Sequence, residues 1–459
     1  MGNISNIILM NKKRWALLIL CILLLVGYYK LFYKTWNNEG VTKNADCIIA
    51  LDIKKITNTL IWNFITTPSQ WKTVSFFSSS DDDKVSWGDM IKLPDYVFVF
   101  HKAGEPQNAF YTVLEINDNE DFEKGFKQFH FTKTATGSYV SEETGIEFMQ
   151  SGNKLLVGNA SVEDKKYIAQ VADELFKQKQ FISEDSLKKN ITASSHVSLL
   201  LFKNSFWGQE QLVTAGFDKN TITIEAVVTP KNGMNLTEKK FTYCENSLCS
   251  FGFALPLSNV KQAFPDSVWA GISRAVNFNI DSLLLKTNHY YQLDIEGFHS
   301  RVDSAISYTY DDDFNPIEKV VVNNVEEPAF NFTVHGDSVS NIYNYWNSNG
   351  KLEKSGDSNL FTPVPFVKSC CFIKNEKELT VTSDNYKNAS ADKSIDCILF
   401  FKLLVTKIPL SLQKYFQPGI LRALKNIESA EATATNEKGQ IILRVRFNKK
   451  KNDLPLIEL

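Results

Sequence analysis

The feature of this 459-residue sequence that most constrains its fold is an internal similarity between its two halves. Four segments of the first half recur in the same order in the second half: 48–56 with 252–260, 148–157 with 372–381, 196–201 with 396–401, and 221–228 with 440–447. One match between apolar strands is common, whereas four in order are typical of a duplicated unit with loop insertions. We therefore predict a tail and anchor at 1–40, a first repeat at 41–235 and a second repeat at 236–459.

Within each copy, strand-like runs alternate with amphipathic segments. Residues 110–114 are predicted as a strand, and Asp118 as the N-cap of a helix with Phe122, Phe126 and Phe129 on one face. In the second half, Val339, Ile342 and Trp346 follow a strand at helical spacing, and a further helix is expected over about 162–178. We predict an α+β fold, with an N-terminal transmembrane helix followed by two similar repeats of antiparallel sheet that have helices packed on one face.

An apolar run near the N-terminus predicts the transmembrane helix. It extends from Trp15 to Tyr33 behind Lys12, Lys13 and Arg14, and Lys30 is its only charged residue. A cleaved signal peptide, the alternative, needs small residues at the end of its core, but this run ends in aromatic side chains. The basic residues before the run favour a cytoplasmic N-terminus. The lipid bilayer is therefore an expected partner through residues 15–33.

Composition excludes one class of partner. Without the five basic residues and the one acidic residue of 1–40, the chain has 45 Lys and Arg against 51 Asp and Glu, a net charge of −6. Such a chain has no basic surface of the kind that binds nucleic acid. Its 33 Phe and 16 Tyr favour strands.

The cysteines leave three interpretations open. Six lie outside the apolar run: Cys47, Cys244, Cys249, Cys370, Cys371 and Cys397. Their surroundings favour buried free thiols, although Cys244 and Cys249 could form a local disulfide in an oxidising compartment. A zinc site is the least favoured reading, because the adjacent Cys370 and Cys371 are poorly placed for tetrahedral ligation.

No motif indicates catalysis. The six histidines show no metalloprotease spacing, and the sequence has no G-x-S-x-G, phosphate-binding loop or dinucleotide fingerprint. The carboxylate clusters 81–83 and 311–313 could hold calcium, but the second has Pro316 where a calcium loop needs Gly, so both are interpreted as solvated turns. We therefore predict no catalytic, cofactor-binding or metal residue and no cofactor.

Two stretches carry a family resemblance. Residues 45–55 (ADCIIALDIKK) and 152–161 (GNKLLVGNAS) resemble uncharacterised membrane-anchored envelope proteins of the Bacteroidetes type, which carry a domain of unknown function. The resemblance covers most of residues 45–240. It implies an N-terminal anchor, a large exported domain and no established activity.

These observations together predict a non-enzymatic, single-pass protein of the bacterial inner membrane, with its N-terminus in the cytoplasm and the bulk of the chain in the periplasm. The expected function is binding or scaffolding in the cell envelope, with an envelope protein, a peptide or a lipid as the ligand and no nucleic acid. The alternative is an envelope enzyme, a hydrolase whose active site is assembled from distant residues that no motif reveals.

Overall fold

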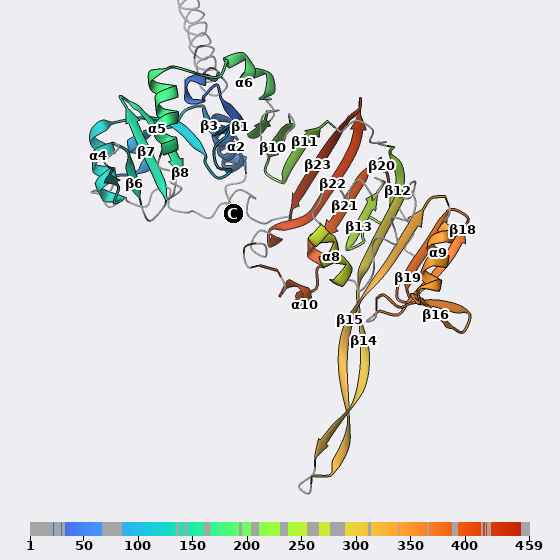
Figure 1. Ribbon diagram of the computed structural model, residues 1–459. Coiled ribbons are helices and arrows are strands. Elements are labelled where there is room, and N and C mark those ends of the chain that lie inside the picture. Colours follow the sequence, from blue (N-terminus) through green and yellow to red (C-terminus); the bar gives the residue numbers. More distant parts are fainter. Residues whose placement is uncertain are drawn as a thin grey trace, which may run out of the picture. The chain divides into compact units, whose positions relative to one another are not determined.

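The structure is a computed structural model that describes residues 22, 29, 33–66, 85–134, 137–141, 145–159, 166–191, 195–202, 211–229, 237–254, 266–275, 290–310, 314–337, 339–364, 367–387, 393–414, 416–417, 419 and 424–450 (Figure 1). Strands hold 51% and helices 23% of the described residues. The chain divides into two compact units, Met1–Lys219 (unit 1) and Asn220–Leu459 (unit 2).

Unit 1 is built on one antiparallel sheet. Its strands are β1 (Ala45–Asp52), β2 (Ile91–Lys92), β3 (Tyr96–Lys102), β4 (Tyr111–Ile116), β5 (Thr132–Lys133), β6 (Tyr139–Ser141), β7 (Ile146–Ser151), β8 (Lys154–Asn159), β9 (Val197–Leu201) and β10 (Gln211–Phe217). They pair in the order β10-β9-β1-β3-β4-β8-β7-β6-β5, and β2 pairs with the last two residues of β4.

Helices cover both faces of this sheet. They are η1 (Asn38–Gly40), α2 (Ile53–Thr66), α3 (Trp87–Met90), α4 (Asn119–Gln128), α5 (Lys166–Ala172), the π-helix η3 (Asp173–Lys177) and α6 (Glu184–Asn190). Leu155 and Leu156 are consecutive in β8 and both buried, yet Leu155 packs in a core with Phe122 of α4, and Leu156 in another with Leu175 of η3. Successive side chains of a strand point to opposite faces, so the prediction of helices on one face is wrong for unit 1.

Two local predictions for unit 1, a helix N-cap and a longer helix, agree with the structure. The carboxylate of Asp118 accepts hydrogen bonds from the backbone N–H groups of Glu120 and Asp121, at 2.8 and 3.0 Å, which confirms it as the N-cap of α4. The helix expected over 162–178 is present from Lys166, and its last turn is the π-helix η3. Residues 162–165 lie outside the described part of the chain.

Unit 2 is also built mainly of antiparallel strands. Its elements are β11 (Thr221–Val228), β12 (Lys239–Tyr243), β13 (Cys249–Phe253), α8 (Asp266–Ala275), β14 (Tyr290–Tyr310), β15 (Pro316–His335), α9 (Val339–Ser348), β16 (Leu352–Ser355), β17 (Ser358–Phe361), β18 (Ser369–Asn375), β19 (Glu378–Ser383), β20 (Lys393–Cys397), β21 (Leu399–Leu404), η5 (Val405–Lys407), α10 (Leu410–Gln413), β22 (Ile427–Glu437) and β23 (Gln440–Lys449). The strand order is β11-β23-β22-β21-β13-β14-β15-β19-β18-β17-β16, and β12 pairs with β20 in a separate two-stranded sheet. Val339, Ile342 and Trp346 of α9 are buried in the core of unit 2, as their helical spacing predicts.

The two units share one order of strands. The order β10-β9-β1-β3-β4-β8-β7 of unit 1 corresponds, strand for strand and in the same direction along the chain, to β22-β21-β13-β14-β15-β19-β18 of unit 2. The aligned segments 148–157 and 372–381 form the equivalent hairpins β7–β8 and β18–β19. Strand β11, which the sequence places in the first repeat, belongs to unit 2 because it pairs with β23.

The predicted transmembrane helix requires correction. The run 15–33 lies outside the described residues, apart from Ile22, Tyr29 and Tyr33. No helix among the described residues is long and apolar enough to cross a bilayer. The uninterrupted apolar run ends at Tyr29 and would span about 22 Å as a helix, short of a bilayer core of roughly 30 Å. The predicted single-pass placement in a bacterial inner membrane, with a cytoplasmic N-terminus and a periplasmic body, is corrected with it. The fold is mostly antiparallel sheet, not the predicted α+β arrangement behind a membrane helix.

Candidate functional site

The sequence predicts no catalytic residue, so the candidate sites are polar clusters and exposed surfaces that the fold assembles. Of the six histidines, His101, His130, His196, His299 and His335 lie in the described part of the chain and His289 does not. The carboxylate clusters 81–83 and 311–313 also lie outside it. Among the described residues, no group of three or more His, Cys, Asp or Glu side chains is placed to hold a metal ion.

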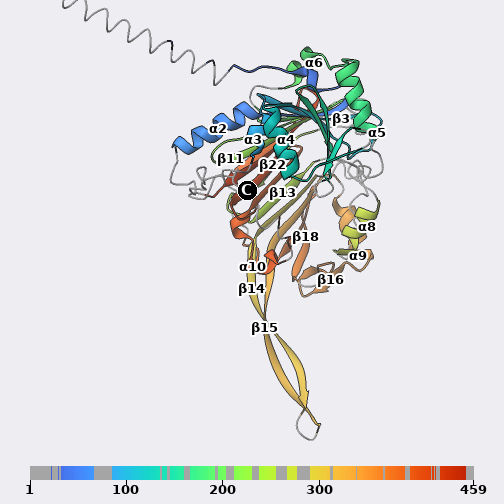
Figure 2. The ribbon, with the colours of Figure 1, turned by 90° about the vertical axis from the view of Figure 1, so that its left-hand side faces the viewer.

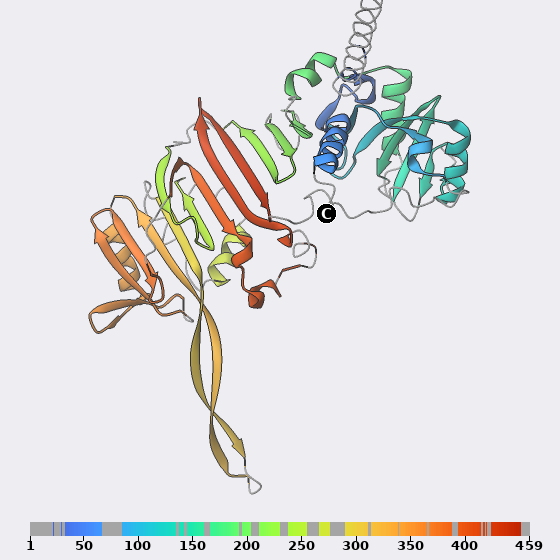
Figure 3. The same ribbon diagram turned by 180° about the vertical axis from the view of Figure 1, so that it is seen from behind.

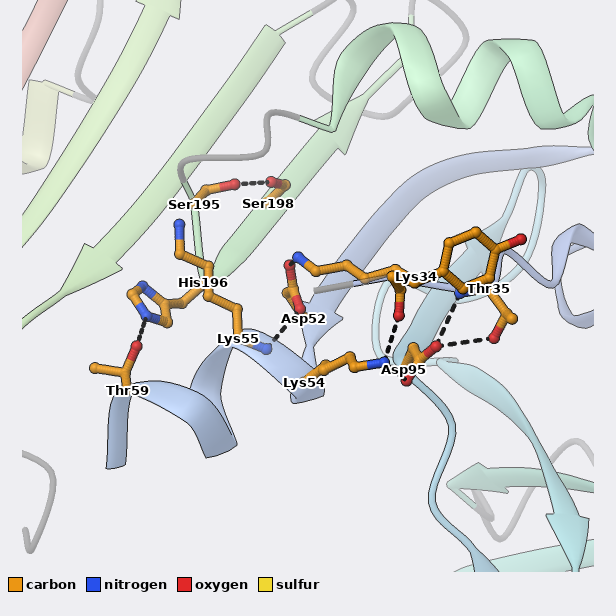
Figure 4. Close-up of polar contacts among 11 residues, drawn as sticks. Lys34, Thr35, Asp52, Lys54, Lys55, Thr59, Asp95, Ser195, His196 and Ser198 are labelled. Carbon is orange, nitrogen blue, oxygen red and sulfur yellow. Dashed lines mark hydrogen bonds and ion pairs between the residues drawn. The ribbon is translucent and has the colours of Figure 1, made fainter. Parts of the chain in front are cut away.

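The first cluster surrounds Asp52, where β1 gives way to α2 (Figure 4). Its side chain, 4% exposed, accepts a hydrogen bond from the backbone N–H of Lys55 at 2.8 Å and pairs with the ammonium group of Lys34. Nearby, Asp95 accepts hydrogen bonds from the backbone and hydroxyl of Thr35 at 2.8 and 2.9 Å. The carboxylates of Asp52 and Asp95 thus hold residues 34 and 35 against unit 1. Asp52 also caps the first turn of α2.

His196 lies beside this cluster, directly before β9 (Figure 4). Its Nδ1 accepts the backbone N–H of Phe217 at 3.2 Å, so the neutral ring carries its proton on Nε2, which lies 2.8 Å from the Thr59 hydroxyl. The ring also stacks on Phe217 with centroids 3.9 Å apart. Burial, reinforced by the positive charge of Lys55, lowers the pKa of His196 to about 4. A neutral, buried ring with both nitrogens engaged holds α2 to the sheet and has no free nitrogen for acid–base catalysis.

A second buried cluster fixes the loop after β3. His101 lies 2.6 Å from a carboxylate oxygen of Asp46 through Nδ1, and 3.0 Å from the carbonyl oxygen of Pro106 through Nε2. The side chains of His101 and Asp46 are 3% and 4% exposed. The imidazole therefore joins strand β1 to the loop that leads from β3 to β4.

The same loop carries Glu105, which joins an extended polar network. The hydroxyl of Tyr111 donates to Glu105 Oε2 at 2.7 Å, and Lys102 lies between Glu105 and Glu174, at 3.6 and 2.6 Å. Glu174 belongs to the π-helix η3, a local irregularity that often marks a functional site. Burial raises the pKa of Glu105, but its side chain is only 3% exposed. No substrate can reach this carboxylate, so the network is structural.

The described cysteines are free thiols. Burial raises the pKa of Cys47 and Cys249 to about 11, and that of Cys371 and Cys397 to about 12. Since the thiolate is the nucleophile and the metal ligand, thiols with such pKa values are poorly suited to either role.

The most exposed apolar surface of the described residues belongs to the hairpin β14–β15. All three views show its outer part projecting as a twisted two-stranded ribbon (Figures 1, 2 and 3). It leaves the sheet at a bulge between Ile295 and Gly297, and its last pair is Tyr310 with Pro316. Bulges bend a strand and increase its twist, which accounts for the departure at this point.

One face of the projecting ribbon carries an apolar stripe. The register pairs Val302 with Asn324, Ser304 with Val322, Ile306 with Val320 and Tyr308 with Glu318, so these side chains share one face. We call this face A and the opposite one face B. The large apolar side chains of face A are 58–67% exposed: Val302, Ile306, Tyr308, Val320 and Val322. Face B carries Arg301, Ser307 and Lys319, together with Ile317, which is 49% exposed, and the half-buried Val321 and Val325. Contiguous exposed apolar side chains of this kind mark interaction sites.

The outer edges of the ribbon are also open. Pairing of β13 with β14 stops at Ile295, and pairing of β15 with β19 begins at Asn331. Between these points, neither strand has an outer neighbour among the described residues. At the turn, Phe314 is 83% exposed and has a positive φ of 61°.

A cavity of about 580 Å³ lies at the base of the hairpin. Leu360, Phe361, Val364 and Val367 form its apolar lining. Its charged lining contains two ion pairs, Arg301 with Glu327 at 2.6 Å and Lys368 with Asp384 at 2.9 Å, and also Glu353. The size fits a small ligand, but the lining mixes apolar, basic and acidic side chains and singles out no ligand class.

Sequence reasoning missed the projecting hairpin, although a signal for it is present. Val302, Ile306 and Tyr308 lie at even-numbered positions of one strand-like segment, and 320–322 form a valine run. The polar clusters have no comparable signal, because His101 and Asp46, or His196 and Thr59, are far apart in the chain.

Comparison with known proteins adds no relative: no family model, no curated protein and no solved structure matches the chain.

Proposed function

We propose that this protein is a non-catalytic binding or scaffolding protein that contacts another protein chain through face A of the β14–β15 hairpin. The observation that carries the proposal is the stripe of five large, mostly exposed apolar side chains on face A of a ribbon that projects from its unit. Two-stranded ribbons gain little stability alone, and an apolar face left in water gains free energy when a partner covers it.

The polar clusters support binding over the enzyme alternative. The side chains of Asp52, His101 and Glu105 are at most 4% exposed, and they contact Lys34, Asp46 and Tyr111, respectively. A hydrolase needs a nucleophile or base that a substrate can reach. The buried thiols lack the low pKa that such a role requires.

A photocrosslinking amino acid placed in the full-length chain tests the proposal in the cells that make it. We expect Ile306, on face A, to give a defined protein adduct on illumination, and Ser307, its neighbour on face B, to give little or none. The two positions are adjacent and exposed, so they control for expression and for local mobility. No adduct from either position, or adducts with lipid alone, would contradict the proposal.

A further inference from the structure

We propose that the partner of the hairpin is a second copy of this chain, which packs its own face A on the first in antiparallel fashion, about a two-fold axis at the pair Ile306–Val320. The inference rests on the proposed function and names the partner of the same surface. A contact of this kind is isologous, so each side chain of the stripe appears twice in the interface.

The stripe requires a partner that lies over the face. A strand added to an open edge of the ribbon would satisfy backbone N–H and C=O groups but would leave Val302, Ile306 and Val320 in water. Packing two ribbons face to face covers these side chains, as in the core between two packed sheets.

Ile306 and Val320 form the pair between Ser304–Val322 and Tyr308–Glu318 on face A. An axis at this pair brings Ser304 of one copy opposite Tyr308 of the other, and Val322 opposite Glu318, whose carboxylate lies at the edge of the two-stranded ribbon. The small side chain of Ser304 leaves room for the tyrosine ring, and the same match is repeated on the other side of the axis. Alternation of large and small side chains across facing positions is what dense packing requires.

The charges of face A favour another apolar face over a lipid surface. Its described charged side chains between Ser300 and Tyr308, and on the strand opposite, are Glu318 and Glu326, whereas Arg301 and Lys319 belong to face B. An anionic membrane surface attracts Lys and Arg, which are missing from this stretch of face A.

The buried area fits a reversible dimer. The five side chains of the stripe are 58–67% exposed, which corresponds to roughly 100 Å² each and about 500 Å² per copy. Two copies would bury about 1,000 Å², the lower limit for a specific interface. We therefore expect a dimer that dissociates in about the micromolar range and not a permanent one.

Opposite charges at the axis provide the decisive test. Ile306→Glu and Ile306→Lys each place two like charges against one another in the dimer, and sedimentation should show each variant dimerising at least about tenfold more weakly than the parent chain. An equimolar mixture of the two should dimerise again, because the facing charges are then opposite. The control is Ser307→Glu on face B, which should dimerise like the parent. Recovery in the mixture also shows that neither variant is misfolded.

A cysteine at the axis gives an independent readout. Ile306→Cys should form a disulfide-linked dimer on mild oxidation, and Ser307→Cys should form none above the background of the parent chain. Equal cross-linking from both positions would indicate edge pairing and overturn the proposal. A parent chain that stays monomeric at about 100 μM would also overturn it.

The two proposals fail differently. If the photocrosslinker at Ile306 captures a different protein while the parent chain is monomeric, self-association is wrong and the binding function stands. If it captures no protein at all and the chain is monomeric, both are wrong.

Discussion

The hairpins β3–β4 and β14–β15 occupy the same place in the strand orders of the two units, yet they are built in opposite ways. β3 and β4 pair at Val99–Thr112 and Phe100–Tyr111, and the loop between them is anchored by buried polar contacts from His101 and Glu105. β14 and β15 continue to Tyr310–Pro316, well past their last sheet neighbours, and expose apolar side chains.

The difference separates stability from binding. In unit 1, the polar groups of the loop lie inside the fold, where each depends on its partner because an unpaired buried group is costly. In unit 2, the outer ribbon touches little of its own unit, so its side chains are free to meet a partner. The two units therefore share a strand order, but the β3–β4 loop is held by buried polar contacts, whereas the outer β14–β15 ribbon exposes apolar side chains.

The largest change in stability is expected from breaking the buried contact between Asp46 and His101 in unit 1. Asp46→Ala removes the carboxylate next to His101, and we expect the free energy of unfolding of unit 1 to fall by about 3–5 kcal/mol, because a buried polar partner is left unpaired. Urea unfolding followed by hydrogen exchange of unit 1 peptides measures the loss.

The matched control is Asp46→Asn, whose amide oxygen still accepts from Nδ1 of His101. It should cost clearly less than the alanine variant. A loss below about 1 kcal/mol for Asp46→Ala would show that the pair does not hold the loop, and would remove the contrast with unit 2.

Lowering the pH is also expected to reduce the stability of unit 1. Folding lowers the pKa of His196 to about 4 from an ordinary value near 6.5. Between these values the unfolded chain binds the proton and the folded chain does not, so this part of the stability is complete above pH 6.5 and is lost as the pH falls towards 4. We expect a loss of about 2 kcal/mol between pH 7 and pH 5. Urea titrations at both pH values measure it, and His196→Gln should show a flatter pH dependence. Parallel curves for the two proteins would contradict the assignment.

A pair of glycines sharpens the comparison between the sheets. Gly252 of β13 lies opposite Phe400, and Gly158 of β8 lies opposite Tyr111, so in each sheet a ring covers a glycine on the next strand. A Cβ at Gly252 would meet Phe400 at 2.1 Å, and one at Gly158 would meet Tyr111 at 2.9 Å. We expect Gly252→Ala to cost about 2–3 kcal/mol and Gly158→Ala about 1 kcal/mol. Thermal unfolding of the two variants tests this order, and the reverse order would be inconsistent with the packing.

The sequence predicts the local elements well and the global features poorly. Capping by Asp118, the buried face of α9 and the hairpins β7–β8 and β18–β19 follow from short-range patterns. The burial of β8 on both faces was missed, although the consecutive Leu155 and Leu156 point to opposite faces of a strand. The membrane anchor was inferred from the apolar run, its aromatic end and the basic residues before it, and none of these is a contact between residues distant in the chain.

The candidate site shows the same limit. The contacts of His101 with Asp46 and Pro106 form because β1 and β3 are neighbours, and no spacing in the sequence indicates them. The exposure of Val302 and Val320 is also invisible in the sequence, since an alternating strand normally has its apolar face covered by the core.

The smallest change in stability is expected from deleting the outer part of the β14–β15 hairpin. Deleting residues 302–324 and joining Arg301 to Val325 through an Asn-Gly turn keeps the Arg301–Glu327 pair and all sheet neighbours of β14 and β15. The free energy of unfolding of unit 2 should change by less than about 1 kcal/mol, because the deleted side chains are mostly exposed. Replacing loop residues 104–109 of unit 1 with glycines removes Glu105 and Pro106 and should cost several times more. If the shortened hairpin instead destabilises unit 2 by several kcal/mol in urea titrations, the ribbon is part of the folding core, and its exposed stripe is not free to serve a partner.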